Sequence, residues 1–321
     1  MKKIVKWVSV FLVLFLIISI AGCIRSPFRK PVKKPEIPAK ISRGPGKEPQ
    51  LTVYLVDEKK NKKMNIEEYV TGVIAGEMKN YWPVEALAAQ AIVARTYVLY
   101  FIESKGGSKY GGADISTDFK EAQAWNPDNI NDRIKRAVEM TRGKVAVYNG
   151  KFINAWFHSH SGGLTATAKE GLAFEEAEPP YIKIVKSPDG GVGPESSWSA
   201  SFIAEEFRSR IKQKLGKDFG EIRSISVGKR GPSGRAVTLR INGTEIAAPD
   251  VRIALDPMRM RSTLLSSLRL ENGKVIIEGK GFGHGVGMAQ WGAKIMAERG
   301  KSPDEIVKYY FKDVEIVNLW D

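Results

Sequence analysis

The residue of this chain whose position best suits catalysis is Glu77. It ends a segment, 66–77, whose apolar residues recur at helical spacing, and it lies three positions after Ile74 and four after Val73. A carboxylate that continues a core-facing stripe is either held by a polar partner or has a raised pKa. A raised pKa suits a general acid near neutral pH. Periodicity alone favours a simpler interpretation, in which Glu77 lies at the rim where the helix meets water.

A second charged residue, Arg95, stands nearly alone in a long apolar segment. Between Val84 and Ile102 the only other charged residue is Glu85. A helix that is apolar around most of its circumference is normally buried, and a guanidinium cannot lose its proton, so Arg95 needs a buried acceptor. It is then either an ion-pair clamp within the fold or a contact for an anionic substrate group. A direct contact would lower the pKa of Glu77, so a substrate contact fits a role in the site better.

The three histidines lie in two segments that contain glycine. His158 and His160 belong to 157–163, and His284 lies in 279–287, where every second residue is glycine. Two histidines two positions apart and a distant third would suit a metal site, but alternate strand residues face opposite sides and no second shell is visible. We therefore expect no metal and no cofactor, and assign the histidines to substrate hydrogen bonding or packing. The alternating glycines indicate an extended segment that a ligand or another backbone approaches closely.

Two residues directly after these glycines suit a sugar ligand. Gln290 offers a hydrogen bond, and Trp291 offers an apolar face for a sugar ring. Trp291 suits the hydrophobic core equally well.

The elements that must position these residues indicate the α+β class. Asn65 and Glu68 are spaced as a capping box for the first helix, and Asn149-Gly150 is a strong hairpin signal. Helices are expected over 66–77, 83–104, 202–215, 288–299 and 302–310, and strands over 51–56, 144–148, 152–157, 181–185, 224–227, 236–241 and 275–278. Helices and strands are segregated, which predicts a single mixed domain with antiparallel strands and a buried central helix.

The N-terminus predicts export. Three lysines precede an apolar run that ends at Ile20-Ala21-Gly22-Cys23, which resembles the lipobox of bacterial lipoproteins. The run is slightly short for a spanning helix, so a lipidated Cys23 is favoured over an uncleaved anchor. We expect a signal peptide over 1–22, a proline- and lysine-rich tether over 23–50 and one domain over 51–321.

Composition restricts the partners. The 321-residue chain has a net charge of +14, of which the leader lysines carry three, leaving +11 for the mature protein. A basic surface suits an anionic partner such as cell-wall polymer or lipid headgroups, and no nucleic-acid recognition motif is visible. With its only cysteine in the lipobox, the domain has neither disulfides nor thiolate metal ligands.

The motifs around these residues resemble the stage II sporulation protein D / LytB (amidase-enhancer) family over roughly 51–320. The first and most specific blocks are Gly76-Glu77-Met78, Trp82–Ala91 and Ala94-Arg95-Thr96-Tyr97. The matching blocks that follow in the same order are 114–116, 123–125, 161–163, 261–262, 283–293 and 309–311.

The resemblance implies a lytic transglycosylase that acts on peptidoglycan glycan strands whose stem peptides an amidase has removed. The family's catalytic glutamate falls on Glu77, and its arginine on Arg95. Some members bind zinc in the region matching 116–125, but this chain has neither cysteine nor histidine there. We therefore expect Glu77 to be the general acid/base. The residues expected to line the glycan groove are Arg95, Tyr97, His158, Ser161, His284, Gln290 and Trp291.

This chemistry needs one carboxyl group, which protonates the leaving oxygen and then deprotonates the C6 hydroxyl of the sugar. A hydrolase usually needs a second carboxylate about 5 to 9.5 Å away, and Asp114, Asp118 and Glu170 stay open for that role. Besides a lytic transglycosylase, two alternatives remain: a hydrolase of sugar or peptide bonds, and a non-catalytic wall-binding protein that stimulates an amidase. The expected location is outside the cell, lipid-anchored to the membrane and facing the wall.

Overall fold

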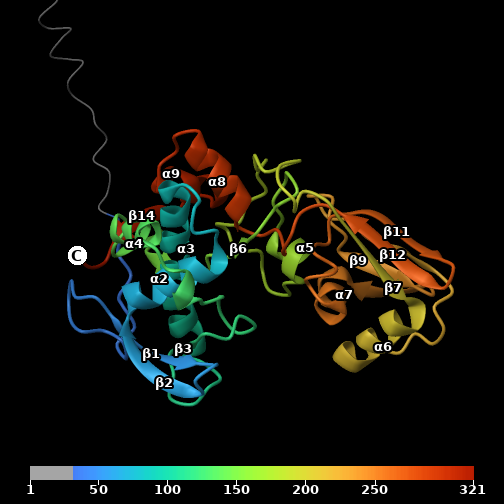
Figure 1. Ribbon diagram of the computed structural model, residues 1–321, viewed down its shortest axis with the longest axis horizontal. Helices are drawn as coiled ribbons and strands as arrows, with labels where there is room; N and C mark the ends of the chain where they lie inside the picture. Colours follow the sequence, from blue (N-terminus) through green and yellow to red (C-terminus); the bar gives the residue numbers. More distant parts are fainter. Residues whose placement is uncertain (1–31) are drawn as a thin grey trace, which may run out of the picture. The chain divides into compact units, whose positions relative to one another are not determined.

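A computed structural model describes residues 32–321, of which 34–321 form one compact unit. Its fold is mixed α and β with mostly antiparallel sheets, as the sequence predicts. The predicted signal peptide, Cys23 and the first part of the tether lie outside the described residues. Within the unit we distinguish a sheet lobe, 198–279, from a helical lobe made of the remaining residues (Figure 1).

The helical lobe is built around one buried helix, α3 (Val84–Lys105). Fifteen of its residues are buried, and it contacts four other helices along its length. These are α2 (Ile66–Glu77), α4 (Asp132–Glu139), α8 (Gln290–Glu298) and α9 (Pro303–Tyr310). Figure 1 shows them grouped around α3. The helix is long and apolar enough to span a membrane, because an 18-residue stretch of it has a mean hydropathy of 1.2. However, 83% of that stretch is buried inside the domain. It is therefore the core helix of this lobe.

Short sheets flank these helices. One has the order β2-β1-β3 and another β14-β4-β5, while β13 and β6 form a parallel pair. Their bounds are β1 Gln50–Leu55, β2 Lys60–Asn65, β3 Ile115–Ser116, β4 Lys144–Tyr148, β5 Lys151–Phe152, β6 Phe157–His158, β13 Met288–Ala289 and β14 Glu315–Asn318. The predicted hairpin is present, with Asn149 and Gly150 both at positive φ between β4 and β5.

The sheet lobe has a hydrophobic core of its own, which includes Phe202, Phe207 and Ile277. Two antiparallel sheets have the orders β11-β12-β7 and β10-β9-β8, and two helices cover them. The bounds are β7 Trp198–Ile203, α6 Ala204–Leu215, β8 Ile225–Val227, β9 Thr238–Ile241, β10 Thr244–Ala247, α7 Ala248–Leu255, β11 Leu265–Glu271 and β12 Lys274–Gly279. The short helix α5 (Ala168–Leu172) contacts α7 and joins the lobes.

Most predicted elements are confirmed, and the exceptions have physical causes. The helix over 66–77 has the predicted bounds, but its capping box is wrong because Asn65 makes no cap and Glu68 pairs with Lys62. The carboxylate of Glu48 accepts the Glu67 N–H instead, at 3.0 Å. Residues 181–185 form no strand and contribute one isolated bridge, at Ile182. The single strand expected over 152–157 is also wrong, because the chain turns between β5 and β6, where the Trp156 N–H donates to the Asn154 carbonyl at 2.9 Å.

The C-terminal part of the predicted tether packs on the domain. Ile41 is 2% exposed, Lys40 pairs with Asp114 at 2.8 Å, and Glu48 binds both Arg142 and the start of α2. The segment is polar in composition, but these specific pairings fix it. A soluble fragment that keeps them should therefore begin near residue 34.

Candidate active site

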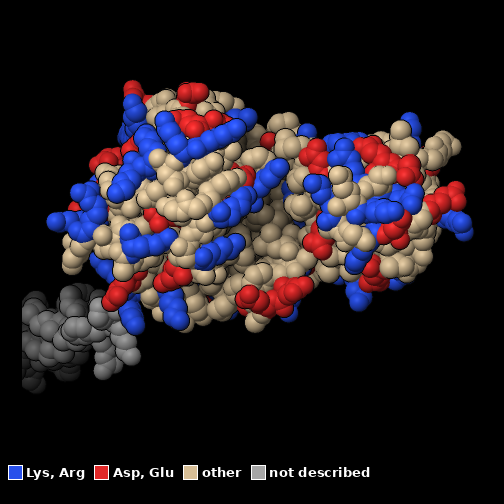
Figure 2. Space-filling view, turned by 90° about the horizontal axis from the view of Figure 1, so that it is seen from below, with Lys and Arg blue, Asp and Glu red and all other residues tan. Residues whose placement is uncertain are grey.

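A groove of about 940 Å³ runs between the lobes. Figure 2 shows the hollow from below, with a largely uncharged floor and with both basic and acidic side chains along its rim. Its walls come from the end of α2, the middle of α3, the loop 119–126, strand β6, helix α7 and the start of α8. Both lobes therefore contribute side chains to it.

Glu77 is the last residue of α2 and faces this groove. The five apolar residues of its stripe are all 0% exposed, whereas Glu77 itself is half-buried. Burial raises the pKa of Glu77 to about 7, although the Ala124 N–H, 2.7 Å away, and the Gln290 side chain both lower it. The carboxyl group is thus protonated in a large fraction of molecules at neutral pH.

Two glycines of α2 bring the loop 119–126 against the helix. A Cβ at Gly72 would lie 2.1 Å from the indole nitrogen of Trp125, and one at Gly76 would lie 2.8 Å from the backbone of Ala124. The Asn126 N–H donates to the Gly72 carbonyl at 3.0 Å. The four-residue spacing of these glycines places both on one helix face. The loop that packs on this face positions the Ala124 N–H to donate to Glu77.

Tyr97 and Gln290, two of the residues expected to contact substrate, line the same groove as Glu77. Gln290 is 5% exposed, and its amide nitrogen makes no geometric hydrogen bond within residues 32–321, although it lies near enough to Glu77 to lower the pKa of that carboxyl. Burial raises the pKa of Tyr97 to about 12, and the charges of Glu121 and Glu77 add to this effect. Both side chains therefore act as neutral hydrogen-bonding groups.

His158 and His284 meet in the groove, with ring centroids 5.6 Å apart. Burial lowers the pKa of His158 well below its usual value, and the charges of His284 and Arg235 act in the same direction. Burial and then the Arg252 charge lower the pKa of His284 to about 3. Nδ1 of His158 lies 3.1 Å from the Val286 carbonyl, so in the neutral ring that nitrogen donates and the unpartnered Nε2 accepts.

The third histidine is not in the groove. His160 Nε2 contacts the Val192 carbonyl at 2.9 Å, and its Nδ1 accepts the Gly162 N–H at 2.9 Å. Within the described residues no group of three His, Cys, Asp or Glu side chains is arranged to hold a metal ion.

Trp291 forms part of the groove wall together with Glu195. The Trp291 ring packs edge-on against Trp82 at 5.0 Å between centroids, and its N–H donates to Glu195. Ser159 donates to the same carboxylate at 2.6 Å. The sequence interpretation missed Glu195, which lies just before the sheet lobe in a glycine-rich loop that gives no periodic signal.

None of the three carboxylates kept open from the sequence lines the groove. Asp114 binds Lys40 and the Thr52 N–H, Asp118 binds Lys109, and Glu170 binds Ser233. The carboxylates that do line it besides Glu77 are Glu121 and Glu195. Burial raises the pKa of Glu121, but hydrogen bonds from Ser108, Ser116 and the Lys109 N–H outweigh this and lower it.

The structure corrects two predicted groove residues. Arg95 is 0% exposed and binds the Glu67 carboxylate through Nε and Nη2, at 2.6 to 3.2 Å, so it is an ion-pair clamp inside the fold. Ser161 is also 0% exposed, and its hydroxyl donates to Asp189 at 2.5 Å. Neither residue lines the groove, because each is fully used by an internal partner.

The groove contains a different arginine, Arg252 of α7. It is only 9% exposed, and its Nε donates to the Arg261 carbonyl at 3.0 Å. Its two terminal nitrogens make no hydrogen bond, and no carboxylate of residues 32–321 lies within ion-pair distance. Burial lowers the pKa of Arg252 to about 10. A buried cation without a counter-ion suits an anionic group that enters the groove.

The alternating glycines pack against protein rather than ligand. A Cβ at Gly283 would lie 2.7 Å from that of His158, and one at Gly287 would lie 2.0 Å from the Trp156 carbonyl. The segment is not extended as expected, because glycines 281, 283, 285 and 287 all have positive φ. Close approach by another backbone, 156–162, is nevertheless what these glycines permit.

Fold and site together define an α+β protein with a glutamate of raised pKa in a groove between two lobes. Residues 56–148 match the stage II sporulation protein family, and 195–287 match a domain of unknown function (DUF8618). The chain belongs to the SpoIID/LytB (amidase-enhancer) family, as its motifs predict.

Three similar proteins illustrate this relationship. An uncharacterised protein of Brachyspira hyodysenteriae is 35% identical, with 79% of this chain and 67% of its own length aligned. Stage II sporulation protein D of Bacillus subtilis is 33% identical, with 83% and 78% aligned. The amidase enhancer of Bacillus subtilis is 29% identical over 75% of this chain, which spans only 39% of that protein.

Proposed function

We propose that this protein is a peptidoglycan lytic transglycosylase that cleaves MurNAc–GlcNAc bonds of peptide-free glycan strands. The observation that carries the proposal is Glu77, a half-buried carboxyl group with a pKa of about 7 in a groove of about 940 Å³. Hydrogen-bond donors hold the other two groove carboxylates, Glu121 and Glu195.

In the proposed reaction Glu77 transfers a proton in two steps, first as an acid and then as a base. Protonated Glu77 donates its proton to the glycosidic oxygen, and the bond from C1 of MurNAc to that oxygen breaks. The Glu77 carboxylate then takes the proton of the C6 hydroxyl as its oxygen bonds to C1, which closes the 1,6-anhydro ring and restores the acid. No water is consumed. The Ala124 N–H contacts the carboxylate and stabilises it between the two proton transfers.

The remaining groove residues suit an uncharged sugar backbone. The unpartnered Nε2 of His158 and the amide nitrogen of Gln290 offer an acceptor and a donor for hydroxyl or N-acetyl groups. The rings of Trp291 and Tyr97 offer apolar surface of the kind that packs against sugar rings. These groups would position the scissile bond beside Glu77.

Arg252 is expected to bind the lactyl carboxylate that distinguishes MurNAc from GlcNAc. Replacing it with glutamine should raise KM for peptide-free glycan roughly 10- to 100-fold, because a charge-assisted hydrogen bond contributes about 1.5–3 kcal/mol. Binding of GlcNAc oligomers, which lack the carboxylate, should not change. Arg252→Lys keeps the charge and should recover part of the affinity, and an equal loss for both ligands would contradict this role.

The pH dependence follows from the raised pKa of Glu77. The protonated acid is present below its pKa, so kcat/KM should stay level at low pH and fall about tenfold per unit above pH 7. The pKa values of His158 and His284 are lowered and that of Tyr97 is raised. None of these groups therefore changes its protonation near pH 7 or adds a second slope to the pH–rate profile. Initial rates measured from pH 5 to 9 test for this decline of kcat/KM above pH 7. A rate that still rises from pH 7 to 9 excludes Glu77 as the acid.

The function is tested by incubating the full chain, in detergent, with peptide-free glycan strands and weighing the products by mass spectrometry. Anhydro-MurNAc ends support a lytic transglycosylase, and reducing ends that carry added water indicate a hydrolase. Binding without cleavage supports the second candidate, a non-catalytic enhancer of an amidase, which the name of one Bacillus subtilis relative suggests. We further propose that the protein is exported and lipid-anchored at Cys23, with its domain facing the wall.

A further inference from the structure

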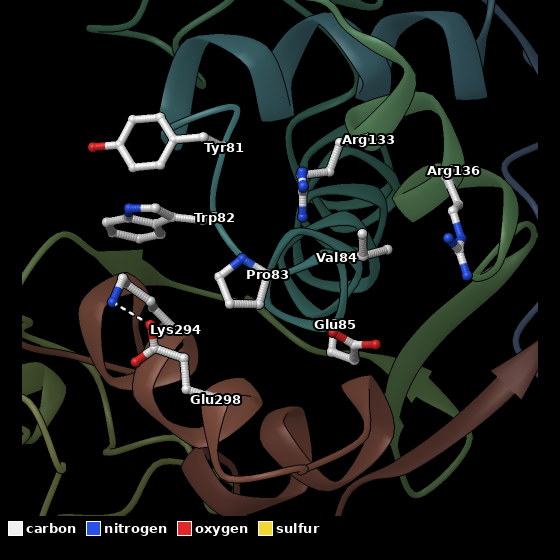
Figure 3. Close-up of a pocket in the computed structure, with 9 residues that line it drawn as sticks. All are labelled: Tyr81, Trp82, Pro83, Val84, Glu85, Arg133, Arg136, Lys294 and Glu298. Carbon is white, nitrogen blue, oxygen red and sulfur yellow. Dashed lines mark hydrogen bonds and ion pairs between the residues drawn. The ribbon is translucent and has the colours of Figure 1, made fainter.

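A second hollow, of about 620 Å³, lies on the other side of Trp82 from the groove. We call it the outer pocket. Figure 3 shows it between the turn that precedes α3, the start of α3, and helices α4 and α8. Its lining residues are Tyr81, Trp82, Pro83, Val84, Glu85, Arg133, Arg136, Lys294 and Glu298.

Two arginines supply most of the positive charge of the outer pocket. Arg133 and Arg136 project from α4 and are exposed, and neither has a carboxylate within ion-pair distance in the described part of the chain (Figure 3). By contrast, Lys294 pairs with Glu298 of the same helix at 2.6 Å. Glu85 is the remaining acidic group of the lining, so the pocket has a net positive charge. Guanidinium groups bind carboxylates in a planar, two-point geometry.

Aromatic rings connect the outer pocket with the groove. Trp82 lines both hollows, and its ring packs edge-on against Trp291 of the groove wall. Tyr81 is 70% exposed, which is unusual for so large a ring and leaves its face open to a ligand. A polymer that leaves the groove over Trp291 and Trp82 therefore reaches Tyr81 and the two arginines.

Asparagine side chains connect the turn that carries the aromatic rings with the helix that carries the arginines. Asn80 donates to the Asn129 carbonyl at 3.2 Å, and Asn131 donates to the Asn80 carbonyl at 3.1 Å. The side chain of Asn131 also caps α4, which carries both arginines. These hydrogen bonds connect the turn 79–83 with helix α4, so the rings and the arginines are linked through the protein as well as through the pocket.

We propose that the outer pocket binds the carboxylate of a muramyl residue in the same glycan strand that occupies the groove. Muramyl units recur at every second sugar, so a strand held at Glu77 presents further carboxylates along its length. The proposal rests on the proposed function, since it needs a glycan in the groove. It makes the protein selective for long strands over isolated disaccharides.

The test measures binding by calorimetry with the full chain in detergent, made inactive by Glu77→Gln. In this background, R133Q/R136Q should bind a peptide-free muramyl octasaccharide about tenfold more weakly, with unchanged affinity for a GlcNAc octamer. Lys135→Gln is the matched control, because Lys135 lies on the same helix and pairs with Asp132 outside the pocket. It should leave both affinities unchanged. Both arginines are exposed, so their replacement should not affect folding.

Two further ligands complete the design. A muramyl disaccharide carries a single lactyl carboxylate, which Arg252 in the groove is expected to bind, so its affinity should not depend on the two arginines of the outer pocket. A second ligand, a strand that keeps its stem peptides, distinguishes binding of the free lactyl carboxylate from binding of peptide carboxylates. Arginine dependence only on the peptide-bearing strand, an equal loss for the GlcNAc octamer, or an unchanged octasaccharide affinity would each overturn the proposal. Failure of the active protein to cleave glycan would instead overturn the proposed function and leave the binding result standing.

Discussion

Glu77→Gln is expected to abolish formation of anhydro-MurNAc ends, with kcat falling by about 10³-fold or more. General acid–base catalysis by one group is typically worth 10²- to 10⁴-fold, and the proposed mechanism uses Glu77 in both proton transfers. No other carboxyl group in the groove is free to replace it, because hydrogen bonds hold Glu121 and Glu195. Counting anhydro ends per minute by mass spectrometry measures the loss.

The glutamine variant is a close structural match. Its amide oxygen can still accept the Ala124 N–H, so the loop 119–126 should keep its position. Because the pKa of Glu77 is raised in the fold, its contribution to stability is present below pH 4.5 and is lost as the pH rises through about 7. Above pH 7 the variant should therefore be at least as stable as the wild type. Anhydro ends formed at more than a tenth of the wild-type rate would show that another group is the acid.

The parts of the fold that local pattern controls could be predicted from the sequence. The stripe that ends at Glu77 repeats at helical spacing, and the helix has the predicted bounds, 66–77, with the stripe fully buried. Helix α3 is apolar on nearly all sides, and it forms the centre of the helical lobe. In both cases burial follows from residues within one element, so no knowledge of its partners is needed.

The choice of polar partner could not be predicted, because it depends on residues distant in the sequence. Arg95 clearly requires an acceptor, but nothing local identifies Glu67 as that acceptor rather than a substrate. Conversely, Arg252 lies in the short helix α7 beside the exposed Ile253, so in the sequence it resembles an ordinary surface residue. Only the contact between the lobes encloses it. The sequence therefore predicts an arginine in the groove, and the fold places Arg252 there instead of Arg95.

Glycine pairs carried more information than the sequence interpretation used. Gly72 and Gly76 lie one helical turn apart, and the loop 119–126 fits against the face that they leave open. Such a pair within an amphipathic helix indicates a close approach by another segment. It does not identify the segment, which here supplies the Ala124 N–H to Glu77. The position of the Glu77 carboxyl group is thus predictable from α2, but the contacts that set its pKa are not.

Arg95→Met is expected to lower the free energy of unfolding by about 3–5 kcal/mol, the cost of breaking a buried ion pair from one side. The Glu67 carboxylate would be left buried, with the Gly143 N–H and the Trp320 indole, both at 3.0 Å, as its remaining donors. Trp320 is 1% exposed, so the loss should extend to packing at the C-terminal end of the chain. Denaturant unfolding monitored by tryptophan fluorescence measures the change.

The double variant Arg95→Met/Glu67→Gln separates an ion-pair clamp from a substrate contact. Removing both charges eliminates the unpaired buried carboxylate, so the double variant should be more stable than Arg95→Met alone. KM per folded molecule should be unchanged in both, since Arg95 is 0% exposed and does not line the groove. A raised KM at full stability would return Arg95 to the glycan-binding site. Equal destabilisation by the single and double variants would show that Arg95 acts through packing, because the charge on Glu67 would then make no difference.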